Sequence, residues 1–146
     1  MISLRPIVLF LIFIIKLKLT ASFFWDREQS YAVTGRVFCG TRDNPVVGAE
    51  VKLVENDRGP DPDEVMDETT TDSDGVFHVS GMQAELFNID AELKIYHNCN
   101  DENTPCKRRH KLYLPDKYIN TDRELDIGDY NLELQVHDDE ERDCFH

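Results

Sequence analysis

Short segments in which apolar and polar residues alternate make up most of the chain, and turn-forming residues separate them. Such alternation is typical of antiparallel strands that bury one face in a core. We therefore predict strands at residues 33–38, 49–53, 65–70, 76–80, 91–98, 107–114 and 130–136, the last of them after a turn at 127–129.

One segment departs from this alternation. Met82, Leu86 and Ile89 recur at helical intervals, so residues 82–89 predict one short helix. Seven or eight short antiparallel strands with one short helix indicate an all-β domain, and specifically a β-sandwich.

The first 22 residues differ in kind from the rest. Residues 6–15 are all apolar, Arg5 precedes them, no acidic residue occurs, and small residues end the segment. The apolar run is too short to span a bilayer of about 30 Å as a helix, and two lysines follow it, which disfavours an uncleaved anchor. We predict a secretory signal peptide at 1–22 and a secreted mature domain at 23–146 without a transmembrane segment.

The chain is strongly acidic. Its 146 residues include 16 Lys and Arg against 29 Asp and Glu, a formal charge of −13; loss of the three basic residues in the signal peptide would bring this to −16. A hydrophobic fraction of 40% and an aromatic fraction of 10% supply enough material for a core. So large a negative charge disfavours a general affinity for nucleic-acid phosphates.

Four cysteines lie in the predicted mature domain, and export favours their pairing as disulfides. Three pairings are possible. Because residues 99–106 would close a short turn-rich loop, we predict Cys99–Cys106 and, with the remaining two, Cys39–Cys144. Histidines flank this loop, but the six residues between Cys99 and Cys106 are too many for the usual zinc-binding pair, so we expect no metal.

No sequence motif of a serine hydrolase, zinc protease or phosphate-binding loop occurs, so we expect a non-enzymatic protein without a cofactor. The acidic run at 138–141 is interpreted as a solvated tail, since nothing around it in the sequence would shift a carboxyl pKa.

One basic cluster stands out against the acidity: Lys107, Arg108, Arg109 and Lys111 fall within five positions. On a strand, Lys107, Arg109 and Lys111 share one face at intervals of about 6.5–7 Å, with Tyr113 beside them. The simpler interpretation, which we favour, is that these cations offset neighbouring acids. The alternative is a contact for an anionic lipid, a glycan or an acidic cell-surface receptor.

Six segments, in this order and spacing, carry a resemblance to a known family: residues 33–37 (VTGRV), 48–53 (GAEVKL), 71–77 (TDSDGVF), 95–99 (IYHNC), 114–119 (LPDKYI) and 141–146 (ERDCFH). Together they resemble the transthyretin-like family of secreted nematode proteins, over residues 31–146. The resemblance implies a transthyretin (prealbumin)-like sandwich of two antiparallel sheets, an extracellular location and disulfides.

The resemblance also suggests functions, although fold alone does not confer one. Some family members are adaptors that recognise phosphatidylserine on dying cells and present it to a phagocyte receptor. If that role applies here, Lys107, Arg109, Lys111 and Tyr113 are the candidate ligand contacts. The alternative is a carrier of a small apolar ligand. A 5-hydroxyisourate hydrolase is least favoured, because residues 143–146 read DCFH where that enzyme has Tyr-Arg-Gly-Ser. The oligomeric state stays open.

Overall fold

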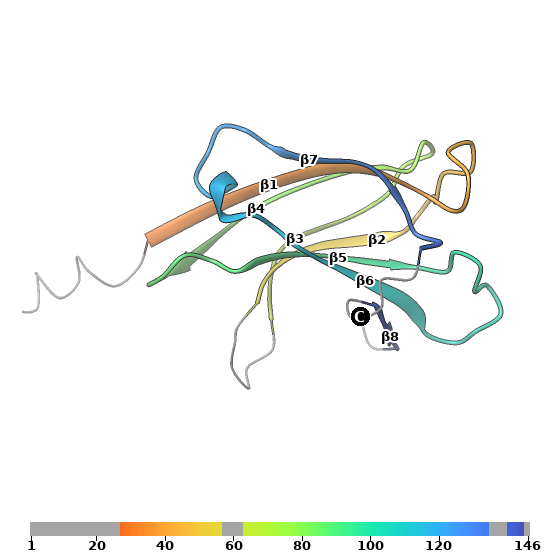
Figure 1. Ribbon diagram of the computed structural model, residues 1–146. Helices are drawn as coiled ribbons and strands as arrows, with labels where there is room; N and C mark the ends of the chain where they lie inside the picture. Colours follow the sequence, from red (N-terminus) through yellow and green to blue (C-terminus); the bar gives the residue numbers. More distant parts are fainter. Residues whose placement is uncertain (1–26, 57–62, 135–139, 145–146) are drawn as a thin grey trace, which may run out of the picture.

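A computed structural model describes residues 27–56, 63–134 and 140–144, so the predicted signal peptide lies outside the described residues. The elements are β1 (Arg27–Phe38), β2 (Glu50–Glu55), β3 (Glu64–Thr70), β4 (Val76–Glu85), β5 (Ala91–His97), β6 (Lys107–Tyr113), the 3₁₀ turn η1 (Asp116–Tyr118), β7 (Leu125–Asn131) and β8 (Glu140–Asp143). They form a three-stranded sheet in the order β4-β1-β7 and a five-stranded sheet in the order β3-β2-β5-β6-β8 (Figure 1). The predicted all-β sandwich is thereby confirmed. Within these ranges no helix is long and apolar enough to cross a membrane.

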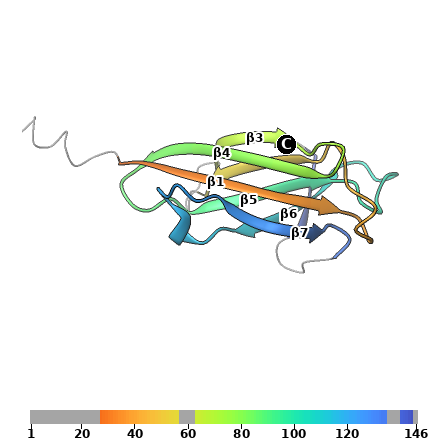
Figure 2. The same cartoon turned by 90° about the horizontal axis from the view of Figure 1, so that it is seen from above.

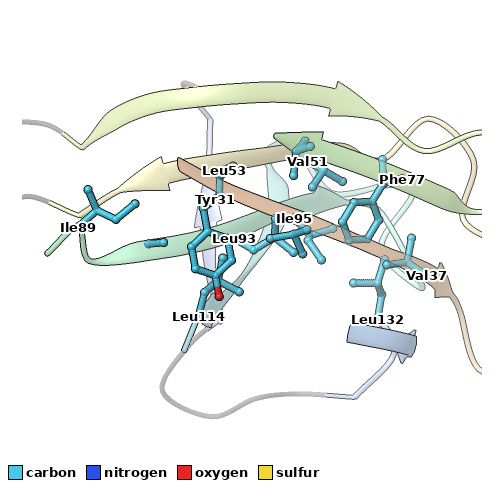
Figure 3. Close-up of a cluster of buried hydrophobic side chains, with 14 of the residues drawn as sticks. Tyr31, Val37, Val51, Leu53, Phe77, Ile89, Leu93, Ile95, Leu114 and Leu132 are labelled. Atoms are coloured by element: carbon cyan, nitrogen blue, oxygen red, sulfur yellow. The ribbon is translucent and has the colours of Figure 1, made fainter. Parts of the chain in front are cut away.

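The core lies between the two sheets, which are layered one over the other in Figure 2. Alternation places Val33 and Val37 of β1 against residues such as Leu93 of β5, and all three are completely buried. Figure 3 shows Val37 and Leu93 together with the larger Tyr31 and Phe77. The inward apolar positions of both sheets thus account for the sandwich.

The predicted helix at residues 82–89 is wrong. β4 continues to Glu85, and Met82 lies opposite Ser30 of β1 with 63% of its surface exposed, whereas Ile89 is completely buried. Three apolar residues happened to match the helical period, but antiparallel pairing with β1 continues through residue 85, and residues 86–89 follow as a loop. The helical turn in the described chain is instead η1, at Asp116–Tyr118.

The expectation of purely antiparallel strands is also wrong, because β7 runs parallel to β1. The residues predicted to form a turn lie inside β7, where the register against β1 shifts between Asp126 and Asp129. Gly128, within this shift, has a φ of 69°, a conformation that glycine adopts without strain. The glycine that suggested a turn therefore marks a bulge.

The predicted disulfides Cys99–Cys106 and Cys39–Cys144 are wrong as well. The structure pairs Cys39 with Cys99, whose Cα atoms are 5.7 Å apart, and Cys106 with Cys144, at 4.3 Å. Cys39 follows β1 and Cys99 follows β5, so this bridge joins the two sheets where both strands end. Cys106 precedes β6 and Cys144 follows β8, and these strands are antiparallel neighbours, which brings the two residues together.

Candidate functional site

The basic cluster lies on β6 with the predicted alternation of faces. Arg108 and His110 point inward and are buried, whereas Lys107, Arg109 and Lys111 alternate with them on the outer side and are partly exposed. The guanidinium of Arg108 donates a hydrogen bond to the carbonyl oxygen of Cys99 at 3.0 Å. Arg108 is therefore a structural residue, and the other three cations form the outward ladder.

Each cation of the ladder has a carboxylate partner. Lys107 Nζ lies 3.4 Å from Glu50 Oε2 on β2. Arg109 contacts both Glu141 and Asp143, the latter at 2.9 Å, and Lys111 Nζ lies 3.8 Å from Glu141. Part of the acidic run predicted to be a solvated tail thus belongs to β8, which pairs with β6. The cations do offset neighbouring acids, as the simpler interpretation held.

The same face carries a second line of cations. Lys52, Lys94 and Lys111 lie opposite one another in register across β2, β5 and β6. Like charges in this arrangement repel, and carboxylates compensate for them: Lys94 pairs with Asp63, and Lys52 Nζ lies 3.0 Å from Glu50. We call this surface the charged face, defined by Glu50, Lys52, Asp63, Glu68, Lys94, Lys107, Arg109, Lys111, Glu141 and Asp143.

The pKa values of Glu50 and Lys52 show that attraction between opposite charges outweighs the effect of burial in these pairs. Burial opposes ionisation of Glu50, but the ammonium groups of Lys52 and Lys107 outweigh it and lower the Glu50 pKa below its ordinary 4.5. Burial likewise opposes the charge on Lys52, and the carboxylate of Glu50 outweighs it and raises the Lys52 pKa. Both groups are therefore charged at neutral pH, and this part of the charged face is a network of opposite charges.

Tyr113 lies at the end of the ladder with 66% of its surface exposed. Its position on the strand places it opposite Glu92 of β5, two residues along the strands from the pair Lys94 and Lys111 and therefore on the same face. Tyr113 also lines a small cleft with Glu92, Asn56, Asp90 and Asp116. Sequence reasoning singled out Tyr113 but missed this cleft, because its residues come from separate strands and loops.

The histidines do not gather into one site. His97 and His110 are buried between the sheets with ring centroids 4.7 Å apart, and His110 Nδ1 lies 3.2 Å from the hydroxyl of Tyr130. His78 lies on the three-stranded sheet and pairs with Glu124. His137 and His146 fall outside the described residues. Among the residues that are described, no three His, Cys, Asp or Glu side chains are arranged to hold a metal ion.

Comparisons with known proteins identify the family. The sequence profile of the transthyretin-like family matches residues 34–115. Transthyretin-like protein 46 of Caenorhabditis elegans is 44% identical over 130 residues, which cover 86% of this chain and 70% of that protein. Transthyretin-like protein 33 of the same organism is 38% identical over 122 residues, 81% of this chain and 83% of that one. The chain belongs to the transthyretin-like family.

Among solved structures, a chain of a 9R-lipoxygenase from Cyanothece matches with a TM-score of 0.46 and 19% identity, over 71% of this chain and 16% of that one, a likeness too distant to bear on function. The family names carry no statement of ligand or reaction. For this transthyretin-like protein, function must therefore be argued from the charged face and from the cleft beside Tyr113.

Proposed function

We propose that this transthyretin-like protein is a secreted, non-enzymatic binding protein that recognises anionic lipid or cell-surface ligands, acting as an adaptor in phosphatidylserine-type bridging. The observation that carries the proposal is the outward ladder of Lys107, Arg109 and Lys111, with exposed Tyr113 at its end, on a chain of net charge −13. Cations concentrated on one strand of an acidic protein favour a local contact with an anionic partner.

Because the cations of the ladder are already paired, an anionic ligand must displace their carboxylate partners. Partly exposed pairs such as Lys107–Glu50 contribute about 0–1 kcal/mol each, so their carboxylates can be displaced. A single phosphate would have to displace Glu50 or Glu141 by itself. A surface that presents many anionic groups gains several contacts at once, which favours a membrane over a free ion.

An adaptor also needs a second surface of different chemistry. Met82 of β4 and the following residues Leu86 and Phe87 are exposed by 63%, 51% and 83%, respectively. These apolar side chains belong to the edge strand of the three-stranded sheet and to the loop after it, whereas the ladder belongs to the five-stranded sheet. Two chemically distinct surfaces suit a protein that contacts a lipid with one and a receptor with the other.

Vesicle co-sedimentation tests the proposal. The vesicles contain phosphatidylserine in a neutral galactolipid, and galactolipid alone is the reference. The test variant replaces the three outward cations: Lys107→Gln, Arg109→Gln and Lys111→Gln. Arg108 is retained, since its buried guanidinium supports the Cys99 carbonyl. The control variant removes the same charge from three exposed residues off the ladder: Arg27→Gln, Lys117→Gln and Arg123→Gln.

We expect the wild type and the control variant to bind phosphatidylserine vesicles, and the test variant to bind at least tenfold more weakly with its circular dichroism unchanged. Binding should also weaken as salt is added. Equal binding by the test variant and the wild type, or no binding by the wild type, contradicts the proposal.

A further inference from the structure

A small cleft opens where β5 begins and β6 ends. Its volume is about 230 Å³, and side chains from four separate segments line it: Asn56 after β2, Asp90 and Glu92 around the start of β5, Tyr113 at the end of β6 and Asp116 in η1. Ala91 and Leu114 complete the lining. Three of these seven residues carry carboxylates, and neither lysine nor arginine is among the described residues that line the cleft. The charged part of the lining is therefore acidic.

Glu92 is the most unusual group in this cleft because only 1% of its surface is exposed. Its Oε1 atom accepts a hydrogen bond from the side-chain amide of Asn56. Its Oε2 atom is buried and has no hydrogen-bond partner in the described chain. A buried carboxylate oxygen without a partner is costly, and native proteins rarely keep one without a reason.

The strands beside Glu92 do not provide a cation. In register, Glu92 lies between Val54 of β2 and Tyr113 of β6, so neither partner is a lysine or an arginine. Two residues further along the strands, on the same face, Lys94 pairs with Asp63 and Lys111 pairs with Glu141. Because these lysines pair with other carboxylates, a cation from outside the chain would supply the partner that Glu92 Oε2 lacks.

The arrangement favours an organic cation over a metal ion. Among the residues described, no three acidic or metal-ligating side chains lie close enough to hold a metal. The volume of about 230 Å³ is also much larger than one ion requires. Tyr113 adds an exposed aromatic ring at the cleft, and aromatic rings attract ammonium groups through their negative faces.

We propose that this cleft binds the ammonium group of a small organic molecule, with the Glu92 carboxylate as its counter-ion and the Tyr113 ring packed against it. The molecule can be free in solution or the headgroup of a lipid, since both present the same ammonium chemistry. The inference stands on Glu92 and the cleft and does not require the ladder of cations to bind anything.

Nuclear magnetic resonance titration of the isotope-labelled protein tests this proposal. The probes are choline and ethanolamine, and the reference compound is the neutral isostere of choline in which a tert-butyl group replaces trimethylammonium. The test variant is Glu92→Gln, which keeps the oxygen that accepts from Asn56 and removes the charge. The control variant Glu28→Gln removes the same charge from an exposed position on β1.

We expect at least one of the two ammonium probes to shift amide signals around Glu92, Tyr113 and Asp116 in the wild type and in Glu28→Gln. Glu92→Gln should bind that probe at least tenfold more weakly. Equal binding of choline and its isostere, shifts that map elsewhere, or no shifts at millimolar concentrations of either probe overturn the proposal. Vesicles of phosphatidylcholine or phosphatidylethanolamine distinguish a free ligand from a lipid headgroup. Binding of the soluble probes alone indicates a free amine. Binding of the vesicles by the wild type, with loss of that binding in Glu92→Gln, indicates a headgroup.

A second measurement separates a binding role from a structural one. Because Glu92→Gln removes a buried charge with an unpartnered oxygen, its melting temperature in the absence of probe should rise above that of the wild type. A lower melting temperature would mean that the carboxylate supports the fold, and it would contradict the proposal. The ammonium probes carry no anionic group, so these results do not depend on whether phosphatidylserine vesicles bind.

Discussion

The two ends of the sandwich are held together by different means. At one end, which we call the disulfide end, Cys39–Cys99 links the two sheets and Cys106–Cys144 links β6 to β8. At the other, the cleft end, the contacts between segments include hydrogen bonds from Tyr31 Oη to the Pro115 carbonyl at 2.9 Å and from Gln29 Nε2 to the Phe87 carbonyl at 2.6 Å. In Figure 1, the start of β5 marks the cleft end and the start of β6 marks the disulfide end.

This difference indicates that the disulfide end contributes stability, whereas the cleft end carries the candidate binding features. The cleft end exposes Phe87 and Tyr113 and buries the Glu92 carboxylate oxygen without a partner, features that oppose stability. Proteins tolerate such features at functional sites when stability is supplied elsewhere. Covalent links at the disulfide end provide that stability without occupying the surface at the cleft end.

The largest effect should follow removal of the bridge between the sheets. Cys39 and Cys99 are 60 residues apart in sequence, so their bridge strongly restricts the unfolded chain. The double variant Cys39→Ser, Cys99→Ser should lose about 2–5 kcal/mol in the free energy of unfolding. Urea denaturation followed by circular dichroism measures the loss.

The second bridge is the matched control. Cys106→Ser, Cys144→Ser releases only the short peripheral strand β8, so we expect a loss of about 1–2 kcal/mol, at the low end of the range for disulfides. Faster hydrogen exchange should be confined to β6 and β8. If both double variants lose equal stability, then the bridge between the two sheets stabilises the fold no more than the bridge between β6 and β8 does. Peptide mapping without reduction checks the two pairings directly.

A smaller effect is expected at the cleft end. Burial, with contributions from Tyr118 and Asp116, raises the pKa of Tyr31 from 10.0 to about 12. Because the folded protein favours the neutral phenol, this stabilisation is complete below pH 10 and is lost as the pH rises from 10 to 12. Tyr31→Phe should cost about 1 kcal/mol at neutral pH, through the hydrogen bond to Pro115, and should abolish this alkaline loss.

Urea denaturation at neutral pH and between pH 10 and 12 measures both parts of this prediction. The exposed Tyr113→Phe is the control and should leave the stability at neutral pH unchanged. An unchanged alkaline loss in Tyr31→Phe would show that another group controls this range.

The smallest effect should come from an ion pair at the disulfide end. The guanidinium of Arg142, followed by the hydroxyl of Thr104, lowers the pKa of Asp101 from 3.8 to about 2. Since the folded protein favours the carboxylate, this contribution is present above pH 3.8 and is lost as the pH falls towards 2. In Asp101→Asn, the free energy of unfolding should therefore fall less steeply as the pH is lowered. At neutral pH this variant should lose less stability than Tyr31→Phe does, since exposed ion pairs contribute little.

Denaturation across the acid range measures this effect, with Arg142→Gln as the partner variant. The two single changes and their combination should lower stability by similar amounts if they remove the same interaction. A loss larger than that of Tyr31→Phe would mean that ion pairs, and not the disulfides alone, hold this end.

Local pattern predicted much of the fold. The alternation along residues 107–113 placed Lys107, Arg109 and Lys111 on one face because successive side chains of a strand point to opposite sides whatever its partners are. The same local rule located five more strands and the β-sandwich class. It failed at Met82, where helical spacing occurred by chance, and at Gly128, where a bulge carries the glycine expected of a turn.

By itself, the sequence determined the class of fold, the faces of the strands and the family, since side-chain alternation and local motifs are properties of neighbouring residues. Tertiary structure decided the disulfide partners, the parallel pairing of β7 with β1 and the carboxylates that meet the cations of β6. It also decided that Glu92, Tyr113 and Asp116 line one cleft. These features depend on which distant strands become neighbours and in which register, and packing of the whole core selects both.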